Sequence, residues 1–236
     1  MRNTSNPRFF PWLTVFSGIV GSALQFWLLS STDAAGLLPQ NHIAGVLSFL
    51  LLALTLAAVF LLIRKAEFSP RYEKLFPRSP VAALGSVAGA SAMAFSTFTM
   101  SGVGLFRFLF PVLGVLSACA LLALAFFRLK GMRPHFLFSC VVAFYLLFRN
   151  LICCRQWGIE PQMLLFFFQL LASLFLLLTC YYRTELDANT RYIRQYAFFN
   201  QAALFCCCLC IPGENGIFYL LAAIWMAADG IRFHHN

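Results

Sequence analysis

The sequence predicts an all-α membrane protein, a polytopic transmembrane helical bundle of about eight spans with N- and C-termini in the cytoplasm. Three observations predict this class. Of the 236 residues, 61% are hydrophobic and 11% are charged, whereas soluble domains have roughly 45–50% and 25%. The apolar residues form eight segments, most of them close to the about 20 residues that a membrane-crossing helix needs. The basic residues alternate between loops as the positive-inside rule requires.

The eight apolar segments account for most of the chain. They are residues 11–30, 42–63, 80–101, 103–127, 134–151, 161–182, 196–211 and 216–228. Eight helices of about 20 residues use roughly 160 residues, so residues 1–236 are expected to form a single integral membrane domain in a cytoplasmic-type cell membrane. The remaining length does not accommodate a soluble enzymatic or nucleic-acid-binding domain.

The first four segments carry recognisable helix signals. Pro11 and Pro80 fit the first helical turn, where the missing N–H of proline costs nothing, and Ser79 is a suitable N-cap. The first apolar run is longer than the ~7–15 residues of a signal peptide, so a retained span is expected, with cleavage as the alternative. In the third segment, Gly85 and Gly89 predict close helix packing inside the bundle. A dimer face is the alternative for these two glycines.

The connector 64–79 and the last four segments follow similar signals. Aromatic residues among the five basic residues of the connector suit the headgroup region, so we expect a connector on the membrane surface, with a partner-docking site as the alternative. Pro134 and Pro161 begin the fifth and sixth segments. Pro212 and Gly213 stop the seventh. The seventh and eighth segments are short for a bilayer.

The charges predict the orientation in the membrane. Fourteen of the 17 Lys and Arg residues fall on the side that holds both termini. The three exceptions are Arg107, Arg149 and Arg155, and three acidic residues on the same side balance them. The net charge of +9 therefore belongs to one face, which the positive-inside rule assigns to the cytoplasm. Asp229, the acid nearest a span, is expected to form a terminal ion pair with Arg232.

A candidate ligand-binding site lies in the outer half of the predicted bundle. Arg107 on the fourth segment and Arg149 on the fifth lie about one helical turn inside the outer boundary. The planar guanidinium group donates two parallel hydrogen bonds to a carboxylate or phosphate. Two inward-facing arginines would therefore form an anion-binding mouth. The alternative is that each arginine snorkels to lipid phosphates.

Four uncharged polar residues extend this candidate site. Asn150 is adjacent to Arg149, and Tyr145 lies one turn away on the same helix side. Gln25 on the first segment and Gln169 on the sixth each share a face with other polar residues. Together with the arginines they predict a polar cavity open to the outside. The alternative is that the glutamines form interhelical hydrogen bonds that only stabilise packing.

No set of residues typical of a catalytic, metal or cofactor site is found, which argues against an enzyme. The centre of the predicted spans also lacks acidic and basic residues, which argues against proton-coupled transport through a buried carboxylate. The expected function is a small transporter or ligand-binding membrane protein for a small anionic or zwitterionic ligand. The alternative is a non-catalytic accessory or assembly subunit of a membrane complex. The expected partners are the lipid bilayer and either a small-molecule ligand or another membrane protein, but not nucleic acid.

Overall fold

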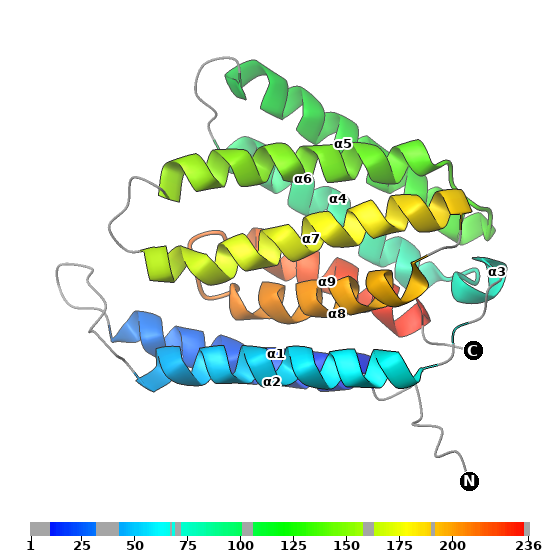
Figure 1. Cartoon of the computed structure of the whole chain (residues 1–236). Helices are drawn as coiled ribbons and strands as arrows, with labels where there is room; N and C mark the ends of the chain where they lie inside the picture. The colour runs from blue at the N-terminus through cyan, green and yellow to red at the C-terminus, as the bar shows by residue number, and fades with distance from the viewer. Residues whose placement is uncertain are drawn as a thin grey trace, which may run out of the picture.

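The computed structural model describes residues 10–31, 43–66, 68, 72–100, 106–157, 163–189 and 192–233. Its helices are α1 (Phe10–Ser30), α2 (Ile43–Lys65), α3 (Tyr72–Leu75), α4 (Pro80–Thr99), α5 (Phe106–Lys130), α6 (Phe136–Trp157), α7 (Met163–Asn189), α8 (Ile193–Leu209) and α9 (Gly216–Phe233). The long helices run alternately in opposite directions, so that α1 begins and α9 ends at the same end of the bundle (Figure 1). This arrangement confirms the predicted helical bundle.

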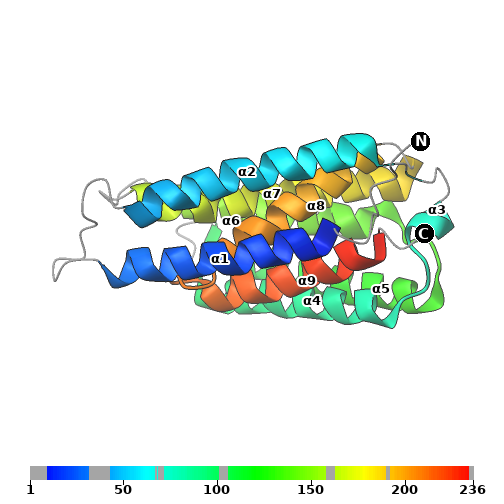
Figure 2. The same ribbon diagram turned by 90° about the horizontal axis from the view of Figure 1, so that it is seen from below.

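Six helices, namely α1, α2, α4, α5, α6 and α7, are long and apolar enough to cross a membrane. Their outer surfaces suit lipid, since Leu50, Leu54 and Leu61 of α2 are each more than half exposed. The chain is therefore a multi-pass membrane protein. Helices α8 and α9 are shorter, but they lie within the same bundle (Figure 2).

Helix α8 lies at the centre of the bundle, where it packs against α1, α2, α7 and α9. Twelve of its seventeen residues are buried. Asn200 and Gln201 sit within this buried stretch, where the Gln201 side chain donates to Asn200 Oδ1 at 3.3 Å. Because protein rather than lipid surrounds α8, the helix tolerates amide side chains that would be costly on a lipid-facing surface.

Two glycines bring α4 close to α9, as predicted for the third apolar segment. A Cβ atom at Gly89 would lie 2.7 Å from Cδ2 of Trp225, and one at Gly85 would overlap the Cβ of Ala228. These distances are shorter than van der Waals contact, so only glycine allows this approach. The expectation of close packing inside the bundle is confirmed.

The basic residues gather at one end of the bundle. Arg64 and Lys65 end α2, Arg128 and Lys130 lie in the last turn of α5, and Arg183 lies near the end of α7. These helix ends lie together on the right of Figure 1. We call this the inner end, because the positive-inside rule predicts that it faces the cytoplasm, and the opposite end the outer end.

Helices α6 and α7 extend several residues beyond the ends expected at 151 and 182. Arg149 therefore lies eight residues, about 12 Å, before the end of α6, rather than one turn. Arg183 and Asp187, which the sequence places in a loop, belong to the last turns of α7. The expected end of α7 was too early because a charged residue resembles a loop residue in sequence, whereas the buried pair of Arg183 and Asp187 allows the helix to continue.

The described part of the connector between α2 and α4 packs on the inner end of the bundle. Leu75 at the end of α3 is fully buried and Phe76 is 4% exposed. Both pack against Val59 and Ile63 of α2 and against Tyr196 of α8. The inner end of the bundle offers these two side chains an apolar recess, and their burial there stabilises this part of the connector.

Candidate functional site

Helix α6 places Arg149 inside the outer half of the bundle, with its side chain fully buried. The Nε of Arg149 donates a hydrogen bond to Ser96 Oγ on α4 at 3.1 Å. Its Nη1 donates to Ser173 Oγ on α7 at 2.9 Å. The guanidinium carbon lies 3.8 Å from the centroid of the Phe218 ring on α9, which adds a cation–π interaction. Four helices therefore meet around one cation.

Arg149 has no carboxylate partner in the part of the chain that the structure describes, where the ion pairs involve other arginines. Its Nη2 is buried and has no hydrogen-bond partner there. A charge at the centre of a membrane helix costs about 2.5–3.5 kcal/mol, and buried charges in proteins are usually paired. A buried, unpaired guanidinium group with a free donor has the chemistry that anion binding requires.

A cavity of about 100 Å³ lies at the outer end between α1, α7 and the α8–α9 connection. Gln25, Gln169, Cys210 and Glu214 are among its lining residues. Both glutamines are nearly buried, and Gln25 Nε2 and Gln169 Oε1 lack hydrogen-bond partners among the described residues. The structure thus brings together the two glutamines that the sequence singled out, with one free donor and one free acceptor.

Ser173 connects this cavity to Arg149. Its hydroxyl accepts from Arg149 and donates to the carbonyl oxygen of Gln169 at 2.8 Å. The same carbonyl accepts a hydrogen bond from the Tyr219 hydroxyl at 3.2 Å. Ser173 lies four residues, about 6 Å, deeper along α7 than Gln169. Arg149 therefore lies about one helical turn below the floor of the outer cavity. We call Gln25, Gln169, Ser173, Tyr219 and Arg149 the outer site.

The other three candidate residues take different positions. Tyr145 is fully buried, its hydroxyl lies 3.2 Å from Thr97 Oγ1, and its ring stacks on Phe110. Asn150 is buried, and neither of its amide atoms has a hydrogen-bond partner within the described residues. Arg107 is exposed on α5. The structure therefore does not bring Arg107 into the buried cluster around Arg149.

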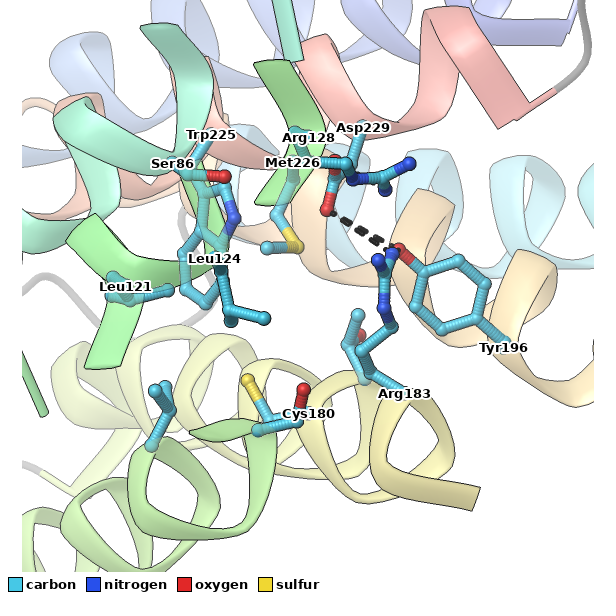
Figure 3. Close-up of a pocket in the computed structure, with 13 residues that line it drawn as sticks. Ser86, Leu121, Leu124, Arg128, Cys180, Arg183, Tyr196, Trp225, Met226 and Asp229 are labelled. Atoms are coloured by element: carbon cyan, nitrogen blue, oxygen red, sulfur yellow. Dashed lines mark hydrogen bonds and ion pairs between the residues drawn. The ribbon is translucent and has the colours of Figure 1, made fainter. Parts of the chain in front are cut away.

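A second polar cluster, which the sequence did not predict, lies at the inner end. Arg128 Nη2 of α5 lies 3.1 Å from Asp229 Oδ1 of α9, and Arg183 Nη1 of α7 lies 3.8 Å from Asp229 Oδ2. Tyr196 of α8 donates to Asp229 Oδ2 at 3.4 Å. These four residues are all less than 10% exposed. They converge from four helices beside a small cavity (Figure 3). We call them, together with Asp187, the inner cluster.

Asp187 joins this cluster through several donors. It lies 3.1 Å from Arg183 Nε and accepts hydrogen bonds from Tyr72 at 2.9 Å and from Ser139 at 2.7 Å. Burial, together with the nearby Asp187, raises the pKa of Tyr72 to about 12. Tyr72 therefore stays protonated and remains a donor at physiological pH. Through Tyr72, the short helix α3 is bound to the end of α7.

The inner cavity has a volume of about 20 Å³, which is room for about one water molecule. Arg128 lines it, and Arg128 Nη1 has no hydrogen-bond partner among the residues that the structure describes. The expected pair of Asp229 with Arg232 cannot be judged, because the Arg232 side chain lies outside the described residues. The spacing of four between Arg183 and Asp187 was the one sequence signal that could have revealed the cluster.

No protein-family model, curated protein or solved structure matches this chain.

Proposed function

We propose that this protein binds a small anionic or zwitterionic ligand at the outer site. The observation that carries the proposal is Arg149, a fully buried cation with a free donor and no acidic partner among the described residues. A structural arginine inside a membrane protein is expected to pair with an acid, since an unpaired buried charge is costly. An anionic ligand would supply the missing negative charge.

The lining of the outer cavity supports the same ligand class. Among the described residues, Nε2 of Gln25 has no partner and can donate to an anionic oxygen, and Oε1 of Gln169 has no partner and can accept from an ammonium group. Glu214, exposed beside them, adds a negative charge at the rim. A molecule with a carboxylate directed inward and an ammonium group directed outward matches these partners. The volume of about 100 Å³ limits the ligand to a few non-hydrogen atoms.

The contribution of Arg149 can be estimated from its depth. A ligand anion in the cavity would lie roughly 7 Å from the guanidinium group, given the rise of about 6 Å between Gln169 and Ser173. At that distance and an effective dielectric constant of about 20, Coulomb attraction amounts to about 2 kcal/mol. Loss of the charge should therefore weaken binding by roughly 30-fold.

The test is calorimetric binding of phosphate, acetate and glycine to the purified protein and to three variants. We expect at least one of the three probes to bind the parent protein. Arg149→Gln should weaken binding by roughly 30-fold, and Arg149→Lys, which keeps the positive charge at that distance, should weaken it less. Arg107→Gln, which removes an exposed arginine, is the matched control and should bind as the parent does.

A fourth variant distinguishes a loss of ligand binding from a loss of the folded state. Gln25→Leu removes an amide donor that has no partner within the described residues, so it should retain the folded state and still weaken binding. Equal affinities of the parent, Arg149→Gln and Gln25→Leu would contradict the proposal, as would no binding of any probe. A non-catalytic accessory subunit of a membrane complex would then be the better explanation.

A further inference from the structure

Four helices, α4, α6, α7 and α9, border both the outer site and the inner cluster. Each helix contributes two residues that lie ten positions apart, one next to each cluster. These pairs are Ser96 and Ser86 on α4, Arg149 and Ser139 on α6, Ser173 and Arg183 on α7, and Tyr219 and Asp229 on α9. All eight side chains are buried. Ten residues correspond to about 15 Å along a helix, so the two clusters are stacked along the bundle at about that separation.

An apolar layer separates the two clusters. Met93 of α4, Val142 and Leu146 of α6, Leu176 of α7 and Ala222 of α9 are all at most 1% exposed and belong to one hydrophobic core. Each of them lies between the paired polar residues of its own helix. The core enclosed by these four helices is therefore polar, then apolar, then polar, which is the layering expected of a transport path closed in its middle and at its inner end.

The inner cluster holds helix ends together by polar contacts. Asp229 of α9 interacts with Arg128 of α5, Arg183 of α7 and Tyr196 of α8. Ion pairs between helices can break and form again when the helices shift, and such exchange is a common way for domains and subunits to move between two states. Asp229 contacts three of the neighbouring helices, so it is the residue whose release would open the inner end.

We propose that the ligand crosses the membrane between α4, α6, α7 and α9 and that the inner cluster, centred on Asp229, is the closed inner gate of this path. The transport step rests on the ligand binding proposed for the outer site. An anion that reaches the inner end can replace the Asp229 carboxylate between Arg128 and Arg183. The ligand itself would then open the gate, and the Asp229 carboxylate would return to the two arginines after the ligand has left.

The labelling rates of two native cysteines can show whether this gate is open. Cys180 of α7 is a free thiol, 3% exposed, that lines the inner cavity with Arg183 and Asp229. Cys207 of α8 is also a free thiol and is fully buried, and it lines neither the inner nor the outer cavity. Opening of the inner gate exposes Cys180 alone, whereas general loosening of the bundle exposes both thiols.

The first experiment measures the labelling rates of these thiols in liposomes that hold the full chain. A membrane-impermeant maleimide is added from the inner face, and the labelled peptides are quantified by mass spectrometry. Asp229→Asn should raise the rate at Cys180 at least 10-fold and leave the rate at Cys207 unchanged. Tyr196→Phe removes the hydrogen bond to Asp229 and the one from Arg183 but keeps both ion pairs of Asp229. It should give a smaller increase, and it replaces Asp229→Asn as the test if that variant does not fold.

Two outcomes would overturn the gate. One is a folded Asp229→Asn protein, or failing that a folded Tyr196→Phe protein, in which Cys180 reacts as slowly as in the parent. The other is an equal rise at Cys180 and Cys207, which would show that the inner cluster only stabilises the fold. Because labelling requires no ligand, the result does not depend on whether the outer site binds one.

The second experiment measures counterflow of radiolabelled phosphate and glycine in the same liposomes. The parent should exchange the probe that it binds, and Arg149→Gln should show the roughly 30-fold weaker binding and correspondingly reduced exchange. Asp229→Asn should bind that probe with the parent affinity but lose coupled exchange. Binding without exchange by the parent would overturn the transport path and leave the proposed function standing, whereas no binding would refute the proposed function itself.

Discussion

Replacing Gly89 with alanine should push α4 and α9 apart. The added Cβ would lie 2.7, 2.9 and 3.0 Å from three ring atoms of Trp225, whereas carbon atoms in van der Waals contact are about 3.5–4.0 Å apart. One helix or the indole ring must therefore move by about 1 Å. The ring is 5% exposed and belongs to the core cluster, so it has little free space to move into. Overpacking of this kind costs typically about 1–3 kcal/mol.

Gly45→Ala is the matched control, because a Cβ atom at Gly45 in α2 would meet no atom within 4 Å. Both substitutions gain up to about 1 kcal/mol of intrinsic helix propensity. The difference between them therefore isolates the clash with Trp225, and it should amount to about 1–3 kcal/mol in the free energy of unfolding.

The assay for both glycine variants is reversible unfolding in mixed micelles by titration with dodecyl sulfate, followed by tryptophan fluorescence. Gly89→Ala should unfold at less dodecyl sulfate than the parent, and Gly45→Ala at the same amount or more. Equal unfolding free energies for the two variants would show that α4 and α9 are not in the close contact described, and the reasoning about their packing would be wrong.

Three further predictions concern other parts of the bundle. Leu75→Ala should lower the free energy of unfolding by about 2–5 kcal/mol, as expected for a buried leucine, whereas no change in a dodecyl sulfate titration would contradict its burial against α2 and α8. Asp187→Asn should cost about 3–5 kcal/mol in the same titration, because it leaves the buried Arg183 with one charged partner fewer, and a neutral effect would contradict the ion pair. In intact cells an impermeant thiol reagent added outside should label Cys154, which is exposed at the outer end of α6, but not a cysteine introduced at Arg78; the reverse pattern would invert the orientation.

The sequence by itself determined the class of protein, the six helices that are long and apolar enough to cross a membrane, and the end of the bundle that carries the positive charge. These properties follow from local composition, because the hydrocarbon layer sets the length of each apolar segment and each Lys or Arg is costly within it. The same local signals placed Arg149, Gln25 and Gln169 in the outer half. The shared polar faces of their helices also indicated that Gln25 and Gln169 point into the bundle.

Only the tertiary structure decided which charges are buried and what they contact. Arg149 and Arg107 have the same side chain and similar predicted depths, yet the first is enclosed by four helices and the second is exposed. Arg128 and Asp229 are 101 positions apart, so no local pattern reveals their ion pair. Arg183 and Asp187 resembled loop residues despite their local spacing of four, because Asp229 and Ser139, which also contact them, come from other helices. The cost of burying a charge depends on the partners that distant helices supply, and the fold brings those partners together.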